Sequence, residues 1–385
     1  MLRFKNDDGI DFPDWEEKSF GDFLITHSEK TSDKDSYPLY SLTIESGVQP
    51  KTERYEREFL VKKEGDNYKI VPPNAFVYNP MNLRFGALKV NHEKFSVSVS
   101  GYYDVFSLKD DSTLAFWENY LVTPRMLNYY FSIATGSLIE KLRVHYSQFV
   151  KIKKAVPSFP EQQKIADFLS TIDTVIEKQK ATVEAWEERK KGVMQKLFSQ
   201  EVRFKADDGS EFPDWEEKKL GECCDILDSL RKPVSKENRI SGKYAYYGST
   251  NIQDYIDDYL FDEPLVLLAE DAGPFDDFWN KAIAQFATGK FWVNNHAHVL
   301  RPYGNRKYFF YALENKDIRM YINNPIRGKL NQEDMIEIPM QIPCLAEQQK
   351  IADCLSALDD VIEKQKATLA AWEEMKKGLL QQMFV

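Results

Sequence analysis

The chain has 385 residues, of which 43% are hydrophobic and 14% aromatic, and it carries a formal net charge of −10. This length suits two domains with linking helices, and this composition is typical of a globular rather than a disordered protein. The sequence contains no run of 18 or more apolar residues, and its first residues are charged where a signal peptide needs an apolar stretch. These features argue against a membrane span or export, and we expect a cytoplasmic protein.

The net negative charge argues at first sight against nucleic acid as a partner. It is unevenly distributed, however, because residues 22–156 sum to +2 (18 basic, 16 acidic) and residues 222–342 to −4 (14 basic, 18 acidic). Most of the acidic excess lies outside these two segments. A partner protein would then supply the positive charge that neutralises DNA phosphates in a complex.

The first repeat begins at the amino terminus. Residues 3–23 (RFKNDDGIDFPDWEEKSFGDF) return at 203–223 with 14 of 21 positions identical, which is an offset of 200. A second repeat joins residues 161–198 to 347–384 with 27 of 38 positions identical, at an offset of 186. Two near-identical frames therefore enclose two different inserts, which is the pattern expected of one mechanical design that reads two unlike things.

The inserts change to short aromatic and β-branched runs that are separated by turns. In the first insert we predict strands at 75–78, 95–99 and 102–108 and a helix at 117–133. In the second we predict strands at 255–261, 265–268, 290–293 and 297–300 and a helix at 308–322. Each insert is thus predicted to be a compact, mostly antiparallel α+β domain with the following long helix packed at its exit.

The second repeated element of each frame predicts a long helix. Its apolar residues recur in steps of four and three, from Ile165 to Leu197 and from Ile351 to Met383, which forms a heptad seam. Equivalent polar residues interrupt the seam in both copies: Gln179 and Lys190, then Gln365 and Lys376. Such interruptions commonly fix register, so we predict that the two helices pair with each other. The alternative is that each helix lies separately on its own domain. At 1.5 Å per residue, each helix would be about 57 Å long.

Four motifs occur in an order that resembles a known family. They are PDWEEKSFG (13–21), PSFPEQQKIADFLSTID (157–173), PDWEEKKLG (213–221) and PCLAEQQKIADCLSALD (343–359). Within the second insert, residues 243–273 and 289–302 look like segments of the same family, and RFGALKV (84–90) and SVSVSGYYDVF (96–106) match more loosely. This order resembles the specificity (S) subunit of type I restriction-modification systems.

The resemblance implies an α+β fold in which two target recognition domains are joined by two long conserved helices that form an antiparallel coiled coil with an internal pseudo-two-fold repeat. The implied limits are 1–156 and 200–342 for the domains with their frame segments, and 157–199 and 343–385 for the helices. Each domain would read one half of a bipartite double-stranded DNA target. The helices would set the spacing, with an upper limit of about 17 base pairs for a rod of their length.

The resemblance also implies a non-catalytic subunit that docks two methyltransferase subunits, with restriction subunits in the same complex. S-adenosylmethionine, ATP and Mg²⁺ would be bound by those partners and no cofactor by this chain. Two equivalent frames suit two copies of one partner. The DNA target, the spacer length and the activity of the restriction partner do not follow from the sequence.

Candidate DNA contacts are polar residues in predicted turns and basic residues of the inserts. Asn pairs with adenine, and the hydroxyls of Ser and Thr can donate a hydrogen bond to a base edge or accept one from it. Lys and Arg contact phosphate or guanine. Each has an alternative structural role, such as a turn, a strand-end cap or a solvated surface. The candidates are Lys51, Arg54, Arg84 and Lys89 in the first insert, and Tyr247, Ser249, Thr250, Asn251, Lys290, Asn294, Asn295, His296, Arg327 and Lys329 in the second.

Catalytic motifs are missing from the sequence. It has no GxxxxGK[ST] phosphate loop, and the nearest approaches to an adenine methyltransferase motif, at 71–74 and 79–82, have the wrong order. His296 and His298 are at strand spacing, but no further convergent ligands are identifiable, so we predict no metal site. The alternatives to a DNA reader are a protein-interaction scaffold without DNA specificity and, less favoured, a DNA-modifying enzyme.

Overall fold

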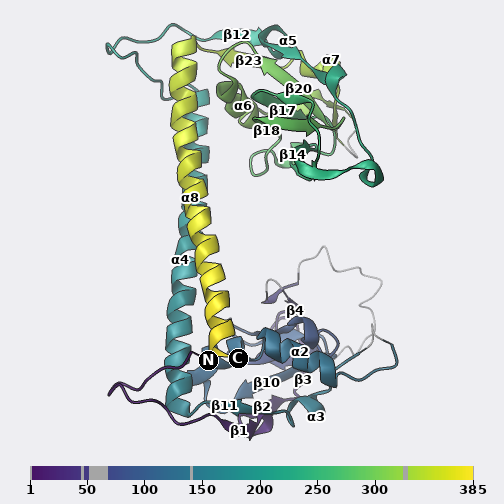
Figure 1. The fold of residues 1–385 in the computed structure, drawn as a ribbon, viewed down its shortest axis with the longest axis vertical. Helices are drawn as coiled ribbons and strands as arrows, with labels where there is room; N and C mark the ends of the chain where they lie inside the picture. Colours follow the sequence, from purple (N-terminus) through teal and green to yellow (C-terminus); the bar gives the residue numbers. More distant parts are fainter. Residues whose placement is uncertain (1, 45–46, 52–67, 139–141, 324–327, 385) are drawn as a thin grey trace. The chain divides into compact units, whose positions relative to one another are not determined.

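The computed structural model describes residues 2–44, 47–51, 68–138, 142–323 and 328–384. It divides into two compact units, residues 1–180 with 368–385 and residues 181–367. The long helices α4 (Phe159–Phe198) and α8 (Leu345–Met383) each contribute one end to each unit (Figure 1). Both predicted helices are therefore present. None of the helices in the described ranges is long and apolar enough to cross a membrane.

The two long helices pair in an antiparallel manner within each unit. In the first unit Asp173 pairs with Lys376 and Lys180 with Glu373. In the second unit the ion pairs are Glu187 with Lys366 and Lys190 with Asp359. Partner numbers fall as residue numbers rise, which defines the antiparallel direction. The predicted pairing of the helices is confirmed, and two of the predicted polar interruptions, Lys190 and Lys376, form its ion pairs.

In each frame, an arginine and a tryptophan are hydrogen-bonded to a fully buried glutamate at the start of the long helix. In the second unit Glu347 accepts hydrogen bonds from Arg203 Nε (3.1 Å) and Nη2 (2.7 Å) and from Trp215 Nε1 (2.9 Å). The paired guanidinium and the indole N–H offset the cost of burying the carboxylate. The first unit repeats the arrangement with Arg3, Trp15 and Glu161. We call each set of three residues a frame clasp.

A short antiparallel ribbon also recurs in both frames. In the first unit β1 pairs with β11, so that Glu16 lies opposite Val156. In the second unit β12 pairs with β23, so that Glu216 lies opposite Ile342. The partners differ by the same 200 and 186 positions that relate the sequence repeats. Each ribbon thus joins the entry and exit of an insert to the frame.

The two inserts share a sheet order although their sequences differ. The main sheet of the first unit has the order β2-β10-β7-β8, and that of the second has the order β13-β20-β17-β18, with all neighbours antiparallel. A second sheet in the second unit, β15-β14-β19-β16, includes one parallel pair, β14 with β19. Helices follow the last strand of the main sheet in both units. The predicted α+β class is confirmed.

The first unit contains the following elements besides the ends of the long helices. They are β1 (Glu16–Ser19), β2 (Leu24–His27), β3 (Lys30–Thr31), β4 (Tyr40–Thr43), β5 (Gly47–Pro50), β6 (Tyr68–Val71), β7 (Phe76–Tyr78), β8 (Leu88–Val90), β9 (Val97–Val99), β10 (Asp104–Leu108), α1 (Leu114–Tyr120), α2 (Pro124–Ile133), α3 (Tyr146–Phe149) and β11 (Lys153–Val156). Its core includes Phe76, Phe106, Trp117 and Phe384, the residue that follows α8.

The second unit contains a corresponding set. It consists of β12 (Glu216–Lys219), α5 (Leu220–Cys223), β13 (Cys224–Ile226), β14 (Ser241–Tyr247), β15 (Ile252–Ile256), β16 (Phe261–Asp262), β17 (Leu265–Ala269), β18 (Ala284–Ala287), β19 (Lys290–Val293), β20 (Ala297–Pro302), α6 (Arg306–Glu314), β21 (Ile322–Asn323), β22 (Lys329–Leu330), α7 (Gln332–Met335) and β23 (Pro339–Ile342). Its largest core cluster includes Leu268, Tyr308, Leu313 and Leu355.

Three predicted elements were wrong in extent. The helix predicted at 117–133 is two helices, because Thr123 caps α2 and Pro124 occupies its first position, where a proline is compatible with helix initiation but not with continuation. The helix predicted at 308–322 ends at Glu314, and a 3₁₀ turn follows at Arg319–Tyr321. The strand predicted at 255–261 separates into β15 and β16, because turn-forming aspartates lie between them, and the side chain of Asp258 accepts from the amide of Tyr259.

Candidate nucleic-acid interface

Two of the predicted motifs in the second insert meet in space. Tyr247 ends β14, and the turn that follows carries residues 248–251. The turn that follows β19 carries Asn294 to His296. Because β14 and β19 are parallel neighbours, both turns leave the same end of the sheet. The amide of Asn294 donates to the carbonyl of Tyr247 (3.1 Å), and Asn294 Nδ2 donates to Gln253 Oε1 (3.1 Å).

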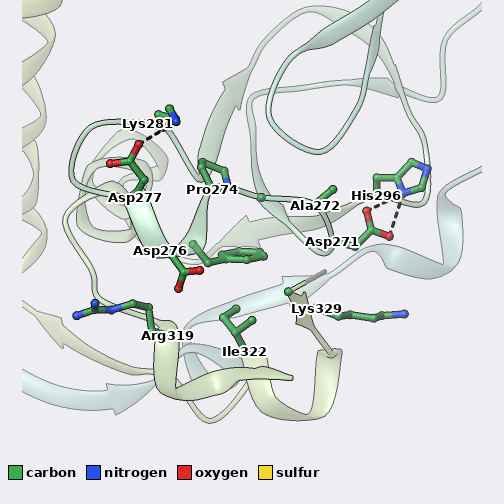
Figure 2. Close-up of a pocket in the computed structure, with 13 residues that line it drawn as sticks. Asp271, Ala272, Pro274, Asp276, Asp277, Lys281, His296, Arg319, Ile322 and Lys329 are labelled. Carbon is green, nitrogen blue, oxygen red and sulfur yellow. Dashed lines mark hydrogen bonds and ion pairs between the residues drawn. The ribbon is translucent and has the colours of Figure 1, made fainter. Parts of the chain in front are cut away.

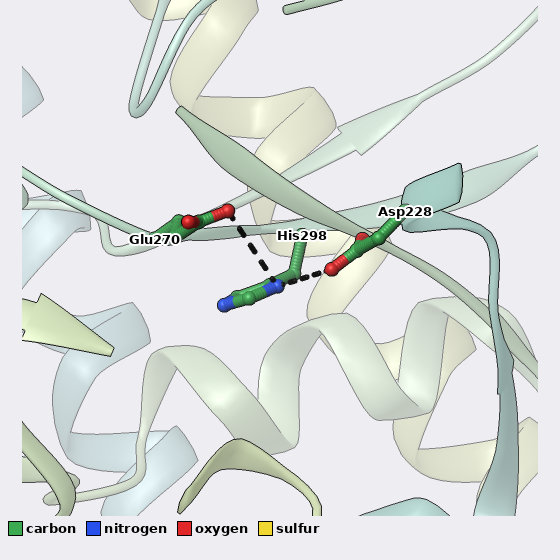
Figure 3. Close-up of side chains that lie close together, drawn as sticks. All are labelled: Asp228, Glu270 and His298. Atoms are coloured by element: carbon green, nitrogen blue, oxygen red, sulfur yellow. Dashed lines mark hydrogen bonds and ion pairs between the residues drawn. The ribbon is translucent and has the colours of Figure 1, made fainter. Parts of the chain in front are cut away.

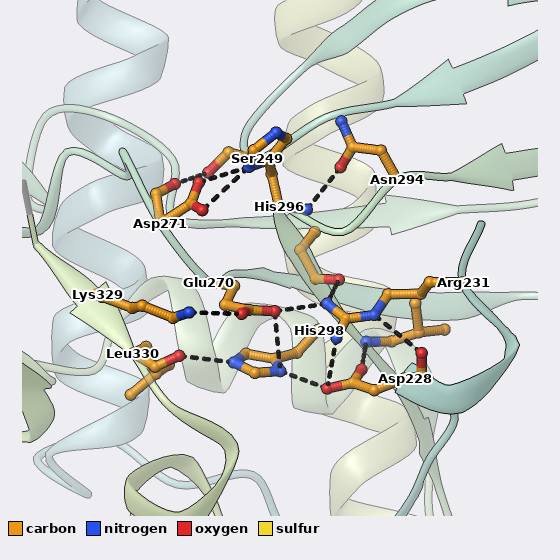
Figure 4. Close-up of polar contacts among 12 residues, drawn as sticks. Asp228, Arg231, Ser249, Glu270, Asp271, Asn294, His296, His298, Lys329 and Leu330 are labelled. Carbon is orange, nitrogen blue, oxygen red and sulfur yellow. Dashed lines mark hydrogen bonds and ion pairs between the residues drawn. The ribbon is translucent and has the colours of Figure 1, made fainter. Parts of the chain in front are cut away.

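Asp271, which the sequence analysis did not single out, connects three of the predicted residues. Its carbonyl accepts a hydrogen bond from Ser249 Oγ (2.5 Å), and its carboxylate oxygens lie 2.8 and 3.0 Å from His296 Nδ1 (Figure 4). A β-bridge joins Asp271 to Lys329. Ser249, His296 and Lys329 therefore gather around one residue at the end of β17. We call this group and the two turns the Asp271 edge.

Exposure separates the predicted residues of the Asp271 edge into two groups. Asn251 and Asn295 are exposed, and Thr250 and His296 are partly exposed. Lys290 is also exposed, but it lies at the start of β19, at the other end of the strand from the turn. Tyr247 instead stacks edge-on against Phe291, with ring centres 5.5 Å apart, and burial raises the pKa of its hydroxyl.

Asn294 belongs to the internal group. It is 2% exposed, and its Oδ1 accepts from the amide of His296 at 2.7 Å, while its Nδ2 is used by Gln253. Its side chain thus holds the turn, whereas its neighbours on that turn face solvent.

A buried charge network lies below this edge. His298 is 1% exposed, and its Nδ1 lies 2.6 Å from Asp228 Oδ2 and 3.9 Å from Glu270 Oε2 (Figure 3). Arg231 Nη1 donates to Glu270 Oε2 (2.6 Å), and Lys329 Nζ lies 3.3 Å from Glu270 Oε1. His296 and His298 therefore engage different carboxylates, although they are two residues apart.

Three residues of the same network are close enough together to be considered as ligands of a metal ion. Ligand atoms of Asp228, Glu270 and His298 lie within 4.8 Å of one another, which is a spacing compatible with an ion. The guanidinium of Arg231 already contacts both carboxylates, at 2.6 Å to Glu270 and 3.3 Å to Asp228, and His298 Nε2 lies 2.9 Å from the carbonyl of Leu330. A cation between the carboxylates would face the positive charge of Arg231, so the donor set favours a charge network over a metal site.

An open cavity of about 1040 Å³ adjoins the Asp271 edge (Figure 2). Its charged lining is mixed, and sequence reasoning missed most of it. Lys281 pairs with Asp277 at 2.9 Å and Arg319 pairs with Asp317 at 2.6 Å. The remaining ionisable residues around it are Asp271, Asp276, His296 and Lys329. A lining of both signs suits contact with base edges better than a clamp on phosphates.

The predicted residues of the first insert are more dispersed. The guanidinium of Arg84 lies 4.7 Å from the ring centre of Phe85 and 5.6 Å from that of Phe131, and both rings are more than half exposed. Lys89 is a partly buried residue of β8, and Lys51 follows β5. The described ranges contain no hydrogen bond or ion pair that joins Lys51, Arg84 and Lys89. Arg54 and Arg327 lie outside the described residues.

A family model described as the type I restriction modification DNA specificity domain matches the chain twice, over residues 13–185 and 213–371. The two matches begin 200 positions apart (213 − 13) and end 186 positions apart (371 − 185), which are the offsets of the two sequence repeats. Together they cover most of the chain.

Curated relatives are specificity subunits. One type I restriction enzyme specificity subunit from Haemophilus influenzae is 38% identical over 153 residues, which are 39% of this chain and 38% of the relative. The MjaVIII specificity subunit of Methanocaldococcus jannaschii is 24% identical over 265 residues, which are 60% of this chain and 61% of the relative. The chain thus spans less than two thirds of the length of these relatives.

Solved structures support the fold. The S subunit of a type I restriction-modification system from M. genitalium has a TM-score of 0.58 at 15% identity, with 100% of this chain and 98% of that chain covered. A chain from a structural study of complex assembly and conformational transition in the type I R-M system has a TM-score of 0.53 at 14% identity, with coverage of 97% and 98%.

Proposed function

The chain belongs to the family of type I restriction-modification DNA specificity domains, and from this premise we propose that it is the DNA-reading, non-catalytic subunit of such a complex in the cytoplasm. The observation that carries the proposal is the duplication of the frame around two different inserts. Both frame clasps and both ribbons recur at the sequence offsets, whereas the side chains on the inserts differ. A constant frame with variable inserts suits two independent readings.

We propose the following division of labour. The segments 1–156 and 200–342 are target recognition domains, each of which reads one half of a bipartite double-stranded DNA target. The helical segments 157–199 and 343–385 set the spacing between half-sites. Two methyltransferase subunits dock on the two equivalent frames. S-adenosylmethionine, ATP and Mg²⁺ act in the methyltransferase and restriction subunits rather than in this chain.

The Asp271 edge is the part of the second domain that we propose to contact bases. Exposed Asn251 and Asn295 offer amides for adenine, and Thr250 and His296 are partly exposed on the same two turns. Lys290 at the start of β19 offers a phosphate contact. Hydrogen bonds from neighbouring residues fix the backbone of both turns, and side chains that contact bases need such rigid support.

In the first domain we propose contacts by Lys51, Arg84 and Lys89, with Arg54 from outside the described residues. Arg84 is partly buried, and its guanidinium is held against two aromatic rings. Arginine in such a setting suits guanine or phosphate.

Methylome sequencing tests the proposal. Cells that express this chain with its cognate methyltransferase subunit are compared with cells that lack only this chain. We expect adenine methylation at a two-part motif with a fixed gap that disappears without the chain. A soluble, assembled complex that produces no such motif would favour the protein-scaffold alternative, and DNA methylation or cleavage by the isolated chain would favour an enzyme.

A further inference from the structure

Side-chain hydrogen bonds tie helix α6 of the second insert, and Asn305 just before it, to α8. Asn305 Nδ2 donates to Gln349 Oε1 (2.8 Å) just before α6 begins. Lys307 Nζ donates to Ser356 Oγ (3.0 Å), and the hydroxyl of Tyr311 donates to Asp359 Oδ2 (2.5 Å). The acceptors advance along α8 as the donors advance along α6, so the two helices run in the same direction over this stretch.

Tyr311 connects the insert to both long helices of its unit. It is 2% exposed, and burial raises the pKa of its hydroxyl, which keeps it a donor. Its acceptor, Asp359, also pairs through Oδ1 with Lys190 Nζ of α4 at 2.5 Å. Lys190 Nζ lies 5.2 Å from the centre of the Tyr311 ring. One buried phenol therefore joins α6, α8 and α4.

The opposite end of α6 is joined to the sheet. Glu314 Oε1 accepts from the amides of Ile283 (3.0 Å) and Ala284 (2.6 Å), where β18 begins. One residue further along β18, Gln285 Nε2 donates to the carbonyls of Gly248 (3.3 Å) and Ser249 (3.0 Å). A continuous series of hydrogen bonds and one short helix thus runs from Asp359 to the turn at the Asp271 edge.

The described residues of the first unit form no such tie at the equivalent place. Subtracting the offset of 186 from Gln349, Ser356 and Asp359 gives Gln163, Ser170 and Asp173 of α4. Within the described ranges, none of these three side chains is hydrogen-bonded to the first insert. Instead, Ser170 and Asp173 line an open cavity of about 810 Å³ that α1 also lines.

We propose that Tyr311 is a positioning residue that fixes the second target recognition domain on the paired helices of its unit, and thereby fixes the placement of the second half-site reading. The described part of the first domain contains no equivalent anchor, and this domain accommodates displacement of its half-site more readily. This inference rests on the proposed function, because it concerns where the second domain presents its reading edge. It does not depend on which residues contact bases.

The test uses the complete methyltransferase complex with the full chain. Initial methylation rates are measured on DNA that carries the native spacer and on DNA with one base pair added or removed. The quantity of interest is the ratio of the altered-spacer rate to the native rate. A substitution that only destabilises the protein lowers both rates together and leaves the ratio unchanged.

We expect Tyr311→Phe to raise this ratio about tenfold, since a hydrogen bond to a charged acceptor contributes about that factor to an equilibrium. The bases read in both half-sites should stay the same. Tyr303→Phe is the matched control, because the Tyr303 hydroxyl also donates to a carboxylate, Asp225 Oδ1 (2.9 Å), but this bond lies within the second insert and reaches neither long helix, so the ratio should stay unchanged.

An unchanged ratio in the Tyr311→Phe complex would overturn the inference. If that variant does not fold, Asp359→Asn weakens the same hydrogen bond from its acceptor side, and an unchanged ratio there would overturn the inference equally. Failure of the proposed function is a separate result, since the wild-type complex would then methylate no bipartite motif at all.

Discussion

Asp173 Oδ1 lies 2.5 Å from Lys376 Nζ, and the pair repeats as Asp359 with Lys190 at the same distance. The offset of 186 converts one pair into the other, since 173 + 186 = 359 and 190 + 186 = 376. Each helix therefore contributes one acid and one base to two equivalent ion pairs. An antiparallel pairing in this register is the arrangement that satisfies both, so the duplicated polar residues specify how the helices align.

The first prediction concerns this alignment. Lys376→Asp places a second carboxylate against Asp173 at a partly buried site, and we expect it to lower the free energy of unfolding by about 1 kcal/mol. Asp173→Lys combined with Lys376→Asp restores opposite charges and should recover much of that loss. Urea unfolding of the four proteins in the double-mutant cycle measures the coupling.

Lys377→Ala serves as the control for that cycle. Lys377 adjoins Lys376, and its ion pair among the residues that the structure describes is with Glu374 on its own helix at an exposed site, so its loss should have little effect. Additive effects of the two reversals would mean that the pair does not fix the alignment.

The helices illustrate how much the sequence can predict. Their pairing followed from polar residues at equivalent seam positions, because a heptad pattern is local and its period can be counted. The burial of Glu161 and Glu347 did not follow, since a glutamate in the sequence EQQK is typical of an exposed helix start. Their arginine partners lie 158 and 144 residues away, and only the tertiary fold brings them together.

The candidate site divides in the same way. The two turns were predicted from their residue types, and the structure places them side by side. Asp271 was missed because its importance lies in three long-range contacts, to Ser249, His296 and Lys329, which no local pattern encodes. The division of 117–133 into two helices was available in the Thr123-Pro124 pair, whereas the shared sheet order of unlike inserts was not.

The second prediction concerns the frame clasps. Glu347→Gln removes the charge that holds Arg203 and should lower the free energy of unfolding by about 2–3 kcal/mol. Arg203→Met leaves the buried carboxylate without its cation and should cost about 3–5 kcal/mol. Equilibrium denaturation of the full chain measures both.

Glu373→Gln is the matched control for the clasp. Glu373 is about half exposed and lies 3.9 Å from Lys180, so its substitution should cost less than about 0.5 kcal/mol. Glu161→Gln in the first frame should match Glu347→Gln. A large difference between the two clasp variants would contradict the equivalence of the frames.

The third prediction concerns the pH dependence of stability. Burial raises the pKa of Glu314 above its ordinary value of 4.5, although the amides of Ala284 and Ile283 oppose this effect. The folded protein therefore binds the proton of the Glu314 carboxyl group more tightly than the unfolded chain does. The stability that this proton contributes is fully present below pH 4.5 and is lost as pH rises through the raised pKa. Glu314→Gln stays neutral and keeps an oxygen acceptor, so its stability relative to the wild type should increase as pH rises from 4 to 8.

Glu263→Gln gives the opposite trend and serves as the control. Arg301 and Arg306 lower the pKa of Glu263, so its contribution is present above the ordinary value of 4.5 and is lost as pH falls through the lowered pKa. The Gln variant should be less stable than the wild type at neutral pH, with the difference shrinking in acid. Because each variant is compared with the wild type at the same pH, the contributions of the other carboxylates to the pH dependence of stability cancel. If the free energies of unfolding of Glu314→Gln and of the wild type differed by the same amount at every pH, the raised pKa of Glu314 would be refuted.

The last prediction separates base contacts at the Asp271 edge from the phosphate contact proposed for Lys290. Asn295→Ala and His296→Ala should each relax one position of the second half-site, with a loss of discrimination of about 1–3 kcal/mol and no change in the first half-site. Lys290→Ala should weaken binding to all sequences alike and lower the slope of log affinity against log salt by about 0.9. Methylome sequencing gives the motif, and titrations of the complex at several salt concentrations give the slope.

Asn294→Ala completes this test, because Asn294 is buried and holds the turn from within. Its loss should blur several positions of the second half-site together rather than one. Asp271→Asn should resemble His296→Ala, since the carboxylate that orients the imidazole is removed. If the exposed-residue variants changed the first half-site, or if all of these variants lowered methylation without altering the motif, the Asp271 edge would not be where the second half-site is read.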